Sequence, residues 1–223
     1  MIVRVGMAPR RRGMSTAEFQ EHWRTTHADA ALLIPGLERY VQNHAVVTDG
    51  RYVLPYPGFD ACAETEFASV EVMDAGFASS EYRETVQVDE HALIDRAAFF
   101  CALTEREVLL DGPSPKGAVK LITLVRVHPI AERSAVLDAL RGEYASAVAA
   151  ADGPRRHELL VTSPEAHRGR YRMACDAIDE VWFDTPGAAF EFVTGAAGIA
   201  AWIHLAGLAL GTERLVARPI RVK

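Results

Sequence analysis

Strand-like and helix-like stretches alternate in a fixed order along the first half of the chain. Ser15 followed by Glu18 has the form of a capping box, which predicts a helix that begins there and ends at a Pro-Gly pair, residues 35–36. β-branched and apolar runs surround this helix and predict strands. The strands are expected at 2–8, 37–47, 61–73 and 97–110, and a second helix at about 74–91. The predicted order is therefore βαββαβ.

The second half repeats this order after a linker rich in Pro and Gly at 112–117. Its apolar runs predict four more strands. A stretch that favours helix through Ala, Leu, Arg and Glu predicts one helix, and a later Ala-rich stretch predicts another. The strands are expected at 120–127, 157–163, 176–183 and 213–222, and the helices at 132–151 and 187–209. We expect two modules of about 110 residues each, at 1–112 and 117–223.

Two short matches support an internal repeat. The segments FDACAETEFAS and CDAIDEVWFDT align with Asp60 on Asp176, 116 positions apart. The segments TEREV (104–108) and TERLV (212–216) are 108 positions apart. The two offsets differ by eight, which an eight-residue deletion in the second copy would explain. Both matches also fall late in their own half, as expected for two copies of one module.

A βαββαβ module is the ferredoxin-like unit, in which two helices cover one face of a four-stranded antiparallel sheet. The run LITLVRV (121–127) has no polar alternation, so the other face of the sheet must be buried as well. The predicted fold class is α+β, with two tandem ferredoxin-like modules that form an intrachain dimeric α/β barrel. A cavity is expected between each sheet and its own helices or loops.

Composition narrows the class of protein. Hydrophobic residues make up 49% of the chain and charged residues 24%, which is typical of a globular protein. The net charge of −6 argues against a broad nucleic-acid-binding surface, since phosphate contacts need dense Lys and Arg. Three widely spaced cysteines make no disulfide framework, which favours a reducing cytoplasm.

One segment, 193–211, is apolar enough to suggest a membrane span. It carries His204 and several glycines, and it is rich in Ala rather than Leu and Ile. We therefore expect a buried helix packed on a sheet and no membrane partner.

The segments RRRGMSTAEFQEHWRTTHADA (10–30) and PGLERYVQNH (35–44) resemble the EthD-like family of dimeric α/β barrels. The resemblance depends on a glycine before a helix with the pattern His-Trp-x-x-x-His, and on an Arg-Tyr pair in the next strand. These positions are Gly13, His22, Trp23, His27, Arg39 and Tyr40, and the later positions Asp89, Asp95 and Glu105 also agree.

The second module matches that family weakly, because its first helix has no Trp or His. The family's usual Trp in the third strand is replaced by Glu66 in the first module and retained as Trp182 in the second. The resemblance thus implies one working pocket, in the first module, and a degenerate second module. Related barrels include muconolactone isomerases, aromatic polyketide cyclases, fungal aromatic dehydratases or decarboxylases, and cofactor-free monooxygenases.

His27 is the candidate catalytic residue, because an imidazole can donate or accept a proton near neutral pH. It shares a helix face with Phe19 and Trp23, at intervals of four residues, and should point inward. The alternative is a core or helix-capping histidine. Trp23 is expected to shape the pocket. Tyr40 and His44 share one face of the second strand, which is either a pocket wall that binds substrate or a solvent-facing surface.

Two acidic residues share a face of the third strand. Glu64 has a counterpart in Glu180, so we expect it to serve structure by pairing with Arg4 or Arg39. Glu66 is not repeated and is the better candidate for binding substrate.

No metal or cofactor is expected. The chain has no CxxC, P-loop or Rossmann glycine motif, and His22 and His27, five residues apart, should lie on different helical faces. The predicted function is a cofactor-independent enzyme that isomerises, cyclises, dehydrates or decarboxylates an aromatic or lactone-type small molecule. The alternatives are a cofactor-free oxidoreductase or monooxygenase and a non-catalytic ligand-binding barrel. Two chains could also pair as a homodimer through edge strands or helix faces.

Overall fold

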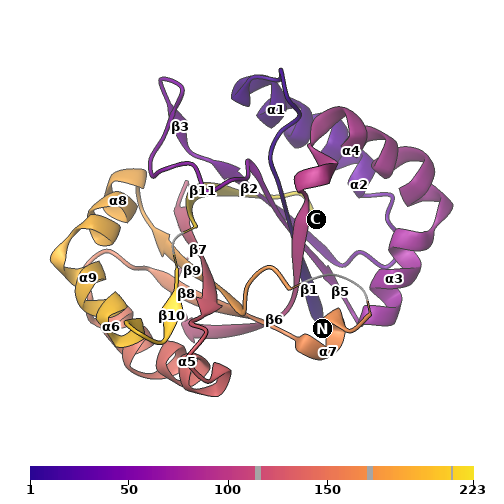
Figure 1. Ribbon diagram of the computed structural model, residues 1–223. Helices are drawn as coiled ribbons and strands as arrows, with labels where there is room; N and C mark the ends of the chain where they lie inside the picture. Colours follow the sequence, from indigo (N-terminus) through magenta and orange to yellow (C-terminus); the bar gives the residue numbers. More distant parts are fainter. Residues whose placement is uncertain (114–116, 170–172, 212) are drawn as a thin grey trace.

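Eight antiparallel strands close into one barrel in the computed structural model (Figure 1). The structure describes residues 1–113, 117–169, 173–211 and 213–223. The first half supplies β1 (Ile2–Ala8), β2 (Arg39–Ala45), β5 (Ala61–Phe67) and β6 (Phe100–Leu110). The second half supplies β7 (Val119–Val127), β8 (Arg156–Thr162), β9 (Ala177–Phe183) and β11 (Arg214–Arg221).

The barrel order is β7-β11-β2-β5-β1-β6-β8-β9, and β9 pairs back with β7. Each half therefore forms a four-stranded sheet in ferredoxin-like order, β2-β5-β1-β6 and β8-β9-β7-β11. The halves join where β2 meets β11 and β6 meets β8, as in the pairs Ala45 with Ala217 and Thr104 with Thr162. These joins pair the edge strands of both sheets within one chain, and they confirm the predicted fold class.

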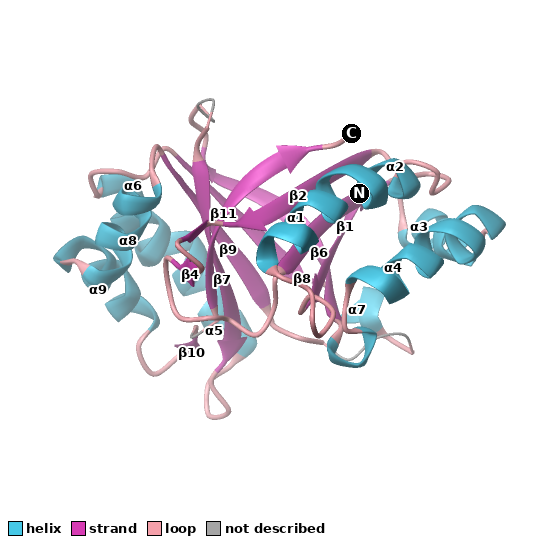
Figure 2. Cartoon of the chain, turned by 90° about the horizontal axis from the view of Figure 1, so that it is seen from above, coloured by secondary structure: helices cyan, strands magenta, loops and turns pink. Residues whose placement is uncertain are grey.

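Helices flank the barrel on two opposite sides, one set from each half, except that the short α7 (Pro164–His167) of the second half packs against the first half (Figure 2). On the first sheet lie α1 (Thr16–His22), the π-helical turn η1 (Trp23–His27), α2 (Ala28–Ala31), α3 (Val70–Ala78), the π-helical turn η2 (Tyr82–Val86), α4 (Gln87–Leu93) and η3 (Arg96–Ala98). The second half has α5 (Arg133–Ala139), the π-helical turn η4 (Leu140–Tyr144), α6 (Ala145–Ala150), α7 (Pro164–His167), α8 (Pro186–Thr194), α9 (Ala196–Trp202) and η5 (Ile203–Leu205). Three two-residue strands complete the order: β3 (Val47–Thr48), β4 (Arg51–Tyr52) and β10 (Ala209–Leu210).

Local caps explain where these elements depart from the prediction. Ser15 forms the expected capping box with Glu18. The third strand ends at Phe67 rather than at residue 73, because the Ser69 side chain accepts a hydrogen bond from a backbone N–H in the next turn and caps α3. The predicted helix at 187–209 breaks at Gly195, which has extended backbone between α8 and α9.

The broken helix also bears on the apolar segment noted above. No single helix in the described residues has the length and apolar composition of a membrane span. The helices Pro186–Thr194 and Ala196–Leu205 have that length and composition only when taken as a pair, and they are bent by 60° relative to each other.

The strand registers test the repeat matches. Asp60 and Asp176 occupy equivalent places, since each donates its backbone N–H to a carbonyl oxygen of the first strand of its own half, that of Ala8 or of Val125. The match of 104–108 with 212–216 is wrong. Thr104 faces Val3 on β1, whereas Lys120, which replaces Val3 in the second sheet, faces Ala217. The equivalent positions in the last strands are thus 113 apart, and Thr212 itself lies outside the described residues.

The barrel interior combines apolar side chains with a buried cluster of charges. Lys120 is 2% exposed, and its Nζ lies 2.5 Å from Glu64 Oε1 and 2.9 Å from Glu180 Oε2. Arg106 adds an ion pair of 2.7 Å to Glu64. Glu64 is therefore an ion-pair partner, as expected, but it pairs with Lys120 and Arg106 instead of Arg4 or Arg39.

Candidate active site

A π-helical turn places two histidines on the same side of the first helix. Residues five apart on an α-helix are separated by about 140° around the axis. The turn at Trp23–His27 is π-helical and therefore wider, so His22 and His27 both reach Asp89 on α4. The prediction that these histidines lie on different faces is wrong for this reason.

Asp89 bridges the two imidazoles. Its Oδ2 lies 2.8 Å from Nδ1 of His27, and its Oδ1 lies 2.6 Å from Nε2 of His22. Burial alone would raise the pKa of Asp89, but the hydrogen bonds from His27 and His22 outweigh it and leave the pKa lowered. A charged carboxylate only accepts hydrogen bonds, so it fixes the ring hydrogen of His27 on Nδ1.

Fixing that hydrogen on Nδ1 leaves Nε2 of His27 as the nitrogen with a free lone pair. Within the described part of the chain, no group hydrogen-bonds to this atom. The side chain is 12% exposed and lines a cavity between the first sheet and its helices. A carboxylate–imidazole pair at a cavity wall is an arrangement that can transfer protons.

The cavity itself is small and adjoins a larger one. The space beside His27 has a volume of about 60 Å³, and Trp23, His27 and Tyr40 all lie on its wall. An adjoining space of about 250 Å³ shares the side chains of Arg4 and Phe99 with it.

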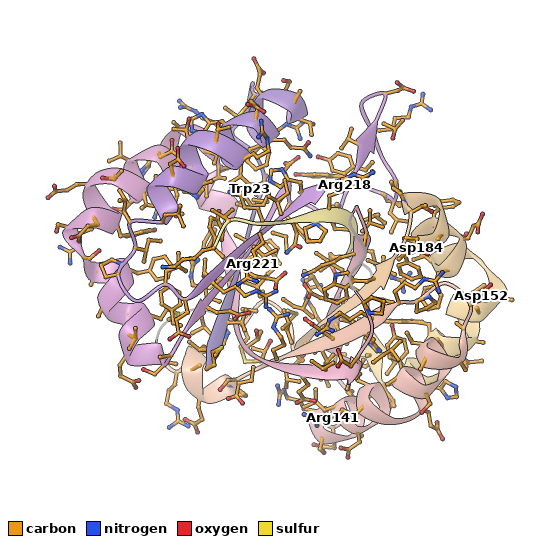
Figure 3. The ribbon with its side chains drawn as sticks, turned by 180° about the vertical axis from the view of Figure 1, so that it is seen from behind. Trp23, Arg141, Asp152, Asp184, Arg218 and Arg221 are labelled. Carbon is orange, nitrogen blue, oxygen red and sulfur yellow. The ribbon has the colours of Figure 1, made fainter. Side chains whose placement is uncertain are left out.

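The predicted residues Trp23, Tyr40 and His44 belong to one hydrogen-bonded group. The indole Nε1 of Trp23 donates to the Tyr40 hydroxyl at 3.1 Å, and Gln42 Nε2 donates to the same hydroxyl at 3.0 Å. The His44 ring lies 4.5 Å from the Trp23 ring, and its Nε2 is 2.8 Å from Gln42 Oε1. Figure 3 shows Trp23 between the helices of the first half and the sheet.

This group resolves the open question about the second strand. Tyr40, Gln42 and His44 face the helices and are buried, so the strand is not a solvent-facing surface. Burial raises the pKa of Tyr40, whose hydroxyl therefore stays neutral. Burial, and then the charge of Arg24, lower the pKa of His44 to about 4. His44 lies behind Trp23, whereas Tyr40 reaches the cavity itself.

Glu66 lies on the opposite face of the sheet from this cavity. It points into the barrel with Glu64, and its Oε1 is 2.9 Å from Arg39 and 2.8 Å from Arg106. The structure thus does not bring Glu66 together with His27.

Three cavity or site residues were not assigned by the sequence argument. Asp89 matched a family position but had no role, and Arg4 and Glu90 were not considered as cavity residues. Arg4 lies 4.4 Å from the Phe77 ring centroid and forms a cationic wall, while Glu90 accepts hydrogen bonds from two neighbouring side chains. The signal in the sequence was the pair of acidic residues, Asp89 and Glu90, on the second predicted helix, which packs against the helix that holds His22 and His27.

The residues that the structure describes include no candidate metal centre. Among them, no group of three or more His, Cys, Asp or Glu side chains could hold a metal ion.

Solved structures with the same architecture define the class to which this fold belongs, the dimeric α/β barrels. An anthrone oxidase-like protein aligns with a TM-score of 0.67 at 14% identity, over 99% of this chain and 93% of that one. Chlorite dismutase from Candidatus Nitrospira defluvii, solved with imidazole, aligns with a TM-score of 0.58 at 7% identity, over 99% and 92%. At such low identities, these TM-scores show a shared fold.

The model of the EthD domain family matches residues 11–97, within the first half of this barrel. The predicted EthD-like resemblance is thereby confirmed for the segment that holds His22, His27 and Asp89. A comparison with curated protein sequences finds no match.

Proposed function

We propose that the first half is a small-molecule enzyme in which His27 transfers a proton without a cofactor. Its substrate would be an aromatic or lactone-type intermediate, and the reaction an isomerisation, cyclisation, dehydration or decarboxylation. The observation that carries the proposal is the Asp89–His27 pair at the wall of the cavity.

In this proposal, Asp89 holds the imidazole in one tautomer and stabilises the imidazolium that forms. Nε2 of His27 removes a proton from an acidic C–H or O–H group and later returns it at a second position of the substrate. Trp23 and Phe99 supply apolar walls for a ring, and Arg4 supplies positive charge for a substrate oxygen that becomes anionic.

A related oxidation is the second candidate, and the anthrone oxidase-like neighbour favours it. His27 would take the same proton and leave a substrate carbanion that reacts directly with molecular oxygen. For a CH₂ group, the substrate and one O₂ would yield a carbonyl and one water. Both proposed functions use the same proton removal by His27 and the same positive charge of Arg4. Only the oxidation consumes O₂, so the dependence of the reaction on oxygen distinguishes them.

Anthrone is a suitable probe because its benzylic C–H is acidic and next to aromatic rings. We expect the protein to accelerate exchange of this hydrogen with D₂O under argon, measured by proton NMR. His27→Ala should slow the enzymatic exchange about 100-fold or more, and Asp89→Asn by a smaller factor. The control is His91→Ala, because His91 is an exposed histidine on the same helix as Asp89.

Oxygen uptake on admission of air would assign the oxidation, and exchange without uptake would assign proton transfer alone. Exchange at the buffer rate, or an unchanged rate in His27→Ala, would contradict the proposal and favour a non-catalytic ligand-binding barrel. Native mass spectrometry of the freshly purified protein would then identify a retained ligand directly.

A further inference from the structure

The second half contains a cavity that the proposed function does not use. It has a volume of about 250 Å³ and lies between β7 and β11 on one side and α8, α9 and η5 on the other. It is thus the counterpart of the first cavity, between a sheet and its own helices. The sequence predicted a degenerate second module, yet this cavity is larger than the cavity beside His27.

The walls of this second cavity are mainly apolar and aromatic. Phe192, Ile199, Trp202 and Ile203 line the helix side, and Leu121 lines the sheet side. A space of this size is slightly below the range of about 300–1,000 Å³ for drug-sized ligands. A molecule of one or two rings would fill it.

One cation stands among these apolar side chains. The Arg214 guanidinium lies 4.8 Å from the centre of the Trp202 ring, and it also lines the cavity. Among the described residues, no carboxylate forms an ion pair with Arg214. Burial lowers the pKa of Arg214, and the nearby Tyr144 and Asp179 do not fully offset this effect. A bound anion would compensate for the desolvated positive charge.

The carboxylate whose charge acts on Arg214 is already satisfied by other partners. Asp179 accepts from the Tyr144 hydroxyl at 2.7 Å, and its Oδ1 is 2.6 Å from Nε2 of His157. Tyr144 ends the π-helical turn η4 as His27 ends η1, so a phenol occupies the place of the His27 imidazole. Burial, and then the Asp179 charge, raise the pKa of Tyr144 well above its ordinary value, which keeps this phenol neutral. The polar wall of the cavity therefore favours binding over proton removal.

We propose that the second cavity is a separate binding site for an aromatic carboxylate of one or two rings. The carboxylate would pair with Arg214, and the ring would lie between the Trp202 and Phe192 side chains. Because the site shares no lining residue with the first cavity, it does not depend on the function proposed for His27.

Isoleucine methyl groups report which cavity is filled. Ile199 and Ile203 line the second cavity, whereas Ile34 and Ile94 line the first. The probe is 2-naphthoate, titrated into protein with ¹³C-labelled isoleucine δ-methyl groups. We expect saturable shifts at Ile199 and Ile203.

Two comparisons test the role of the charge. Arg214→Gln should weaken 2-naphthoate binding about tenfold or more, while Arg218→Gln should leave it unchanged. Arg218 is the matched control because it is an exposed arginine on the same strand (Figure 3). Neutral 2-naphthalenemethanol should bind the wild-type protein about tenfold more weakly than 2-naphthoate, and this comparison needs no variant.

Unchanged Ile34 and Ile94 resonances would show that Arg214→Gln is folded. The proposal is overturned if 2-naphthoate gives no saturable shift at Ile199 and Ile203, or shifts only Ile34 and Ile94. Equal affinity for the acid and the alcohol would also overturn it. Failure of anthrone exchange at His27 would leave these isoleucine shifts unaffected, so the two proposals fail independently.

Discussion

Replacing Glu180 by Gln should change how the stability of the barrel depends on pH. Burial, and then the neighbouring Glu64 carboxylate, raise the pKa of Glu180 to about 8. For Glu64, burial opposes ionisation, but Lys120 and Arg106 outweigh it, so the pKa of Glu64 is lowered. The pair therefore keeps one proton at neutral pH, and we place it on Glu180, which has one cation at hydrogen-bonding distance while Glu64 has two.

The sign and size of the effect follow from this proton. Between the ordinary pKa of 4.5 and the folded value of about 8, the folded protein holds a proton that the unfolded chain has released. The stabilisation is complete below pH 4.5, falls progressively as the pH rises from 4.5 to 8, and is lost above about pH 8. Each pH unit in this window is worth about 1.4 kcal/mol at most. From about pH 5 to about pH 8, Glu180 should therefore cost the wild-type protein roughly 3 kcal/mol of stability.

Urea denaturation of the two proteins across this range measures the effect. Glu180→Gln resembles the protonated side chain, so its free energy of unfolding relative to wild type should rise by roughly 3 kcal/mol between about pH 5 and about pH 8. The control, Glu105→Gln, makes the same change at an exposed position on β6 and should give a curve parallel to wild type. Parallel curves for Glu180→Gln as well would refute the reasoning.

Three further substitutions test the packing around the candidate site. His44, whose pKa is lowered to about 4, loses its stabilising contribution as the pH falls from 6.5 to 4, so His44→Gln should reduce the acid sensitivity of chemical denaturation. Gly76→Ala should lower the melting temperature, at a cost of about 1–3 kcal/mol, because its Cβ would lie 2.5 Å from the Pro35 carbonyl oxygen. Tyr40→Phe should cost about 1–3 kcal/mol in urea denaturation, because the Trp23 indole N–H loses its acceptor, and an unchanged midpoint would contradict that role.

The fold was predictable because its signals are local. Strand and helix patterns, the Ser15 capping box and the repeat around Asp60 and Asp176 all depend on residues close in sequence. The last strand was aligned wrongly because a five-residue resemblance carries no register information, whereas strand pairing sets Thr104 opposite Val3.

The candidate site was only partly predictable, for two physical reasons. The helix period placed Trp23 and His27 on one inward face, but a regular period does not reveal a π-helical turn, so the link between His22 and His27 was missed. Asp89 reaches His27 from a helix 62 positions later, which depends on tertiary packing.

Strand alternation has a similar limit. It showed that Glu64 and Glu66 share a face, but it does not tell which face of a doubly buried sheet points into the barrel. The pairing of β2 and β6 with the second half decides this, and it turns Glu66 towards Arg39 and Arg106.

The tautomer of His27 tests the central claim most directly. Long-range ¹H–¹⁵N NMR spectra distinguish the two ring nitrogens of a neutral histidine. We predict that the hydrogen is on Nδ1, that anthrone shifts the Nε2 resonance, and that Asp89→Ala removes the preference for Nδ1. A wild-type His27 with its hydrogen on Nε2, or a spectrum unchanged by Asp89→Ala, would contradict the claim that Asp89 prepares this imidazole for proton transfer.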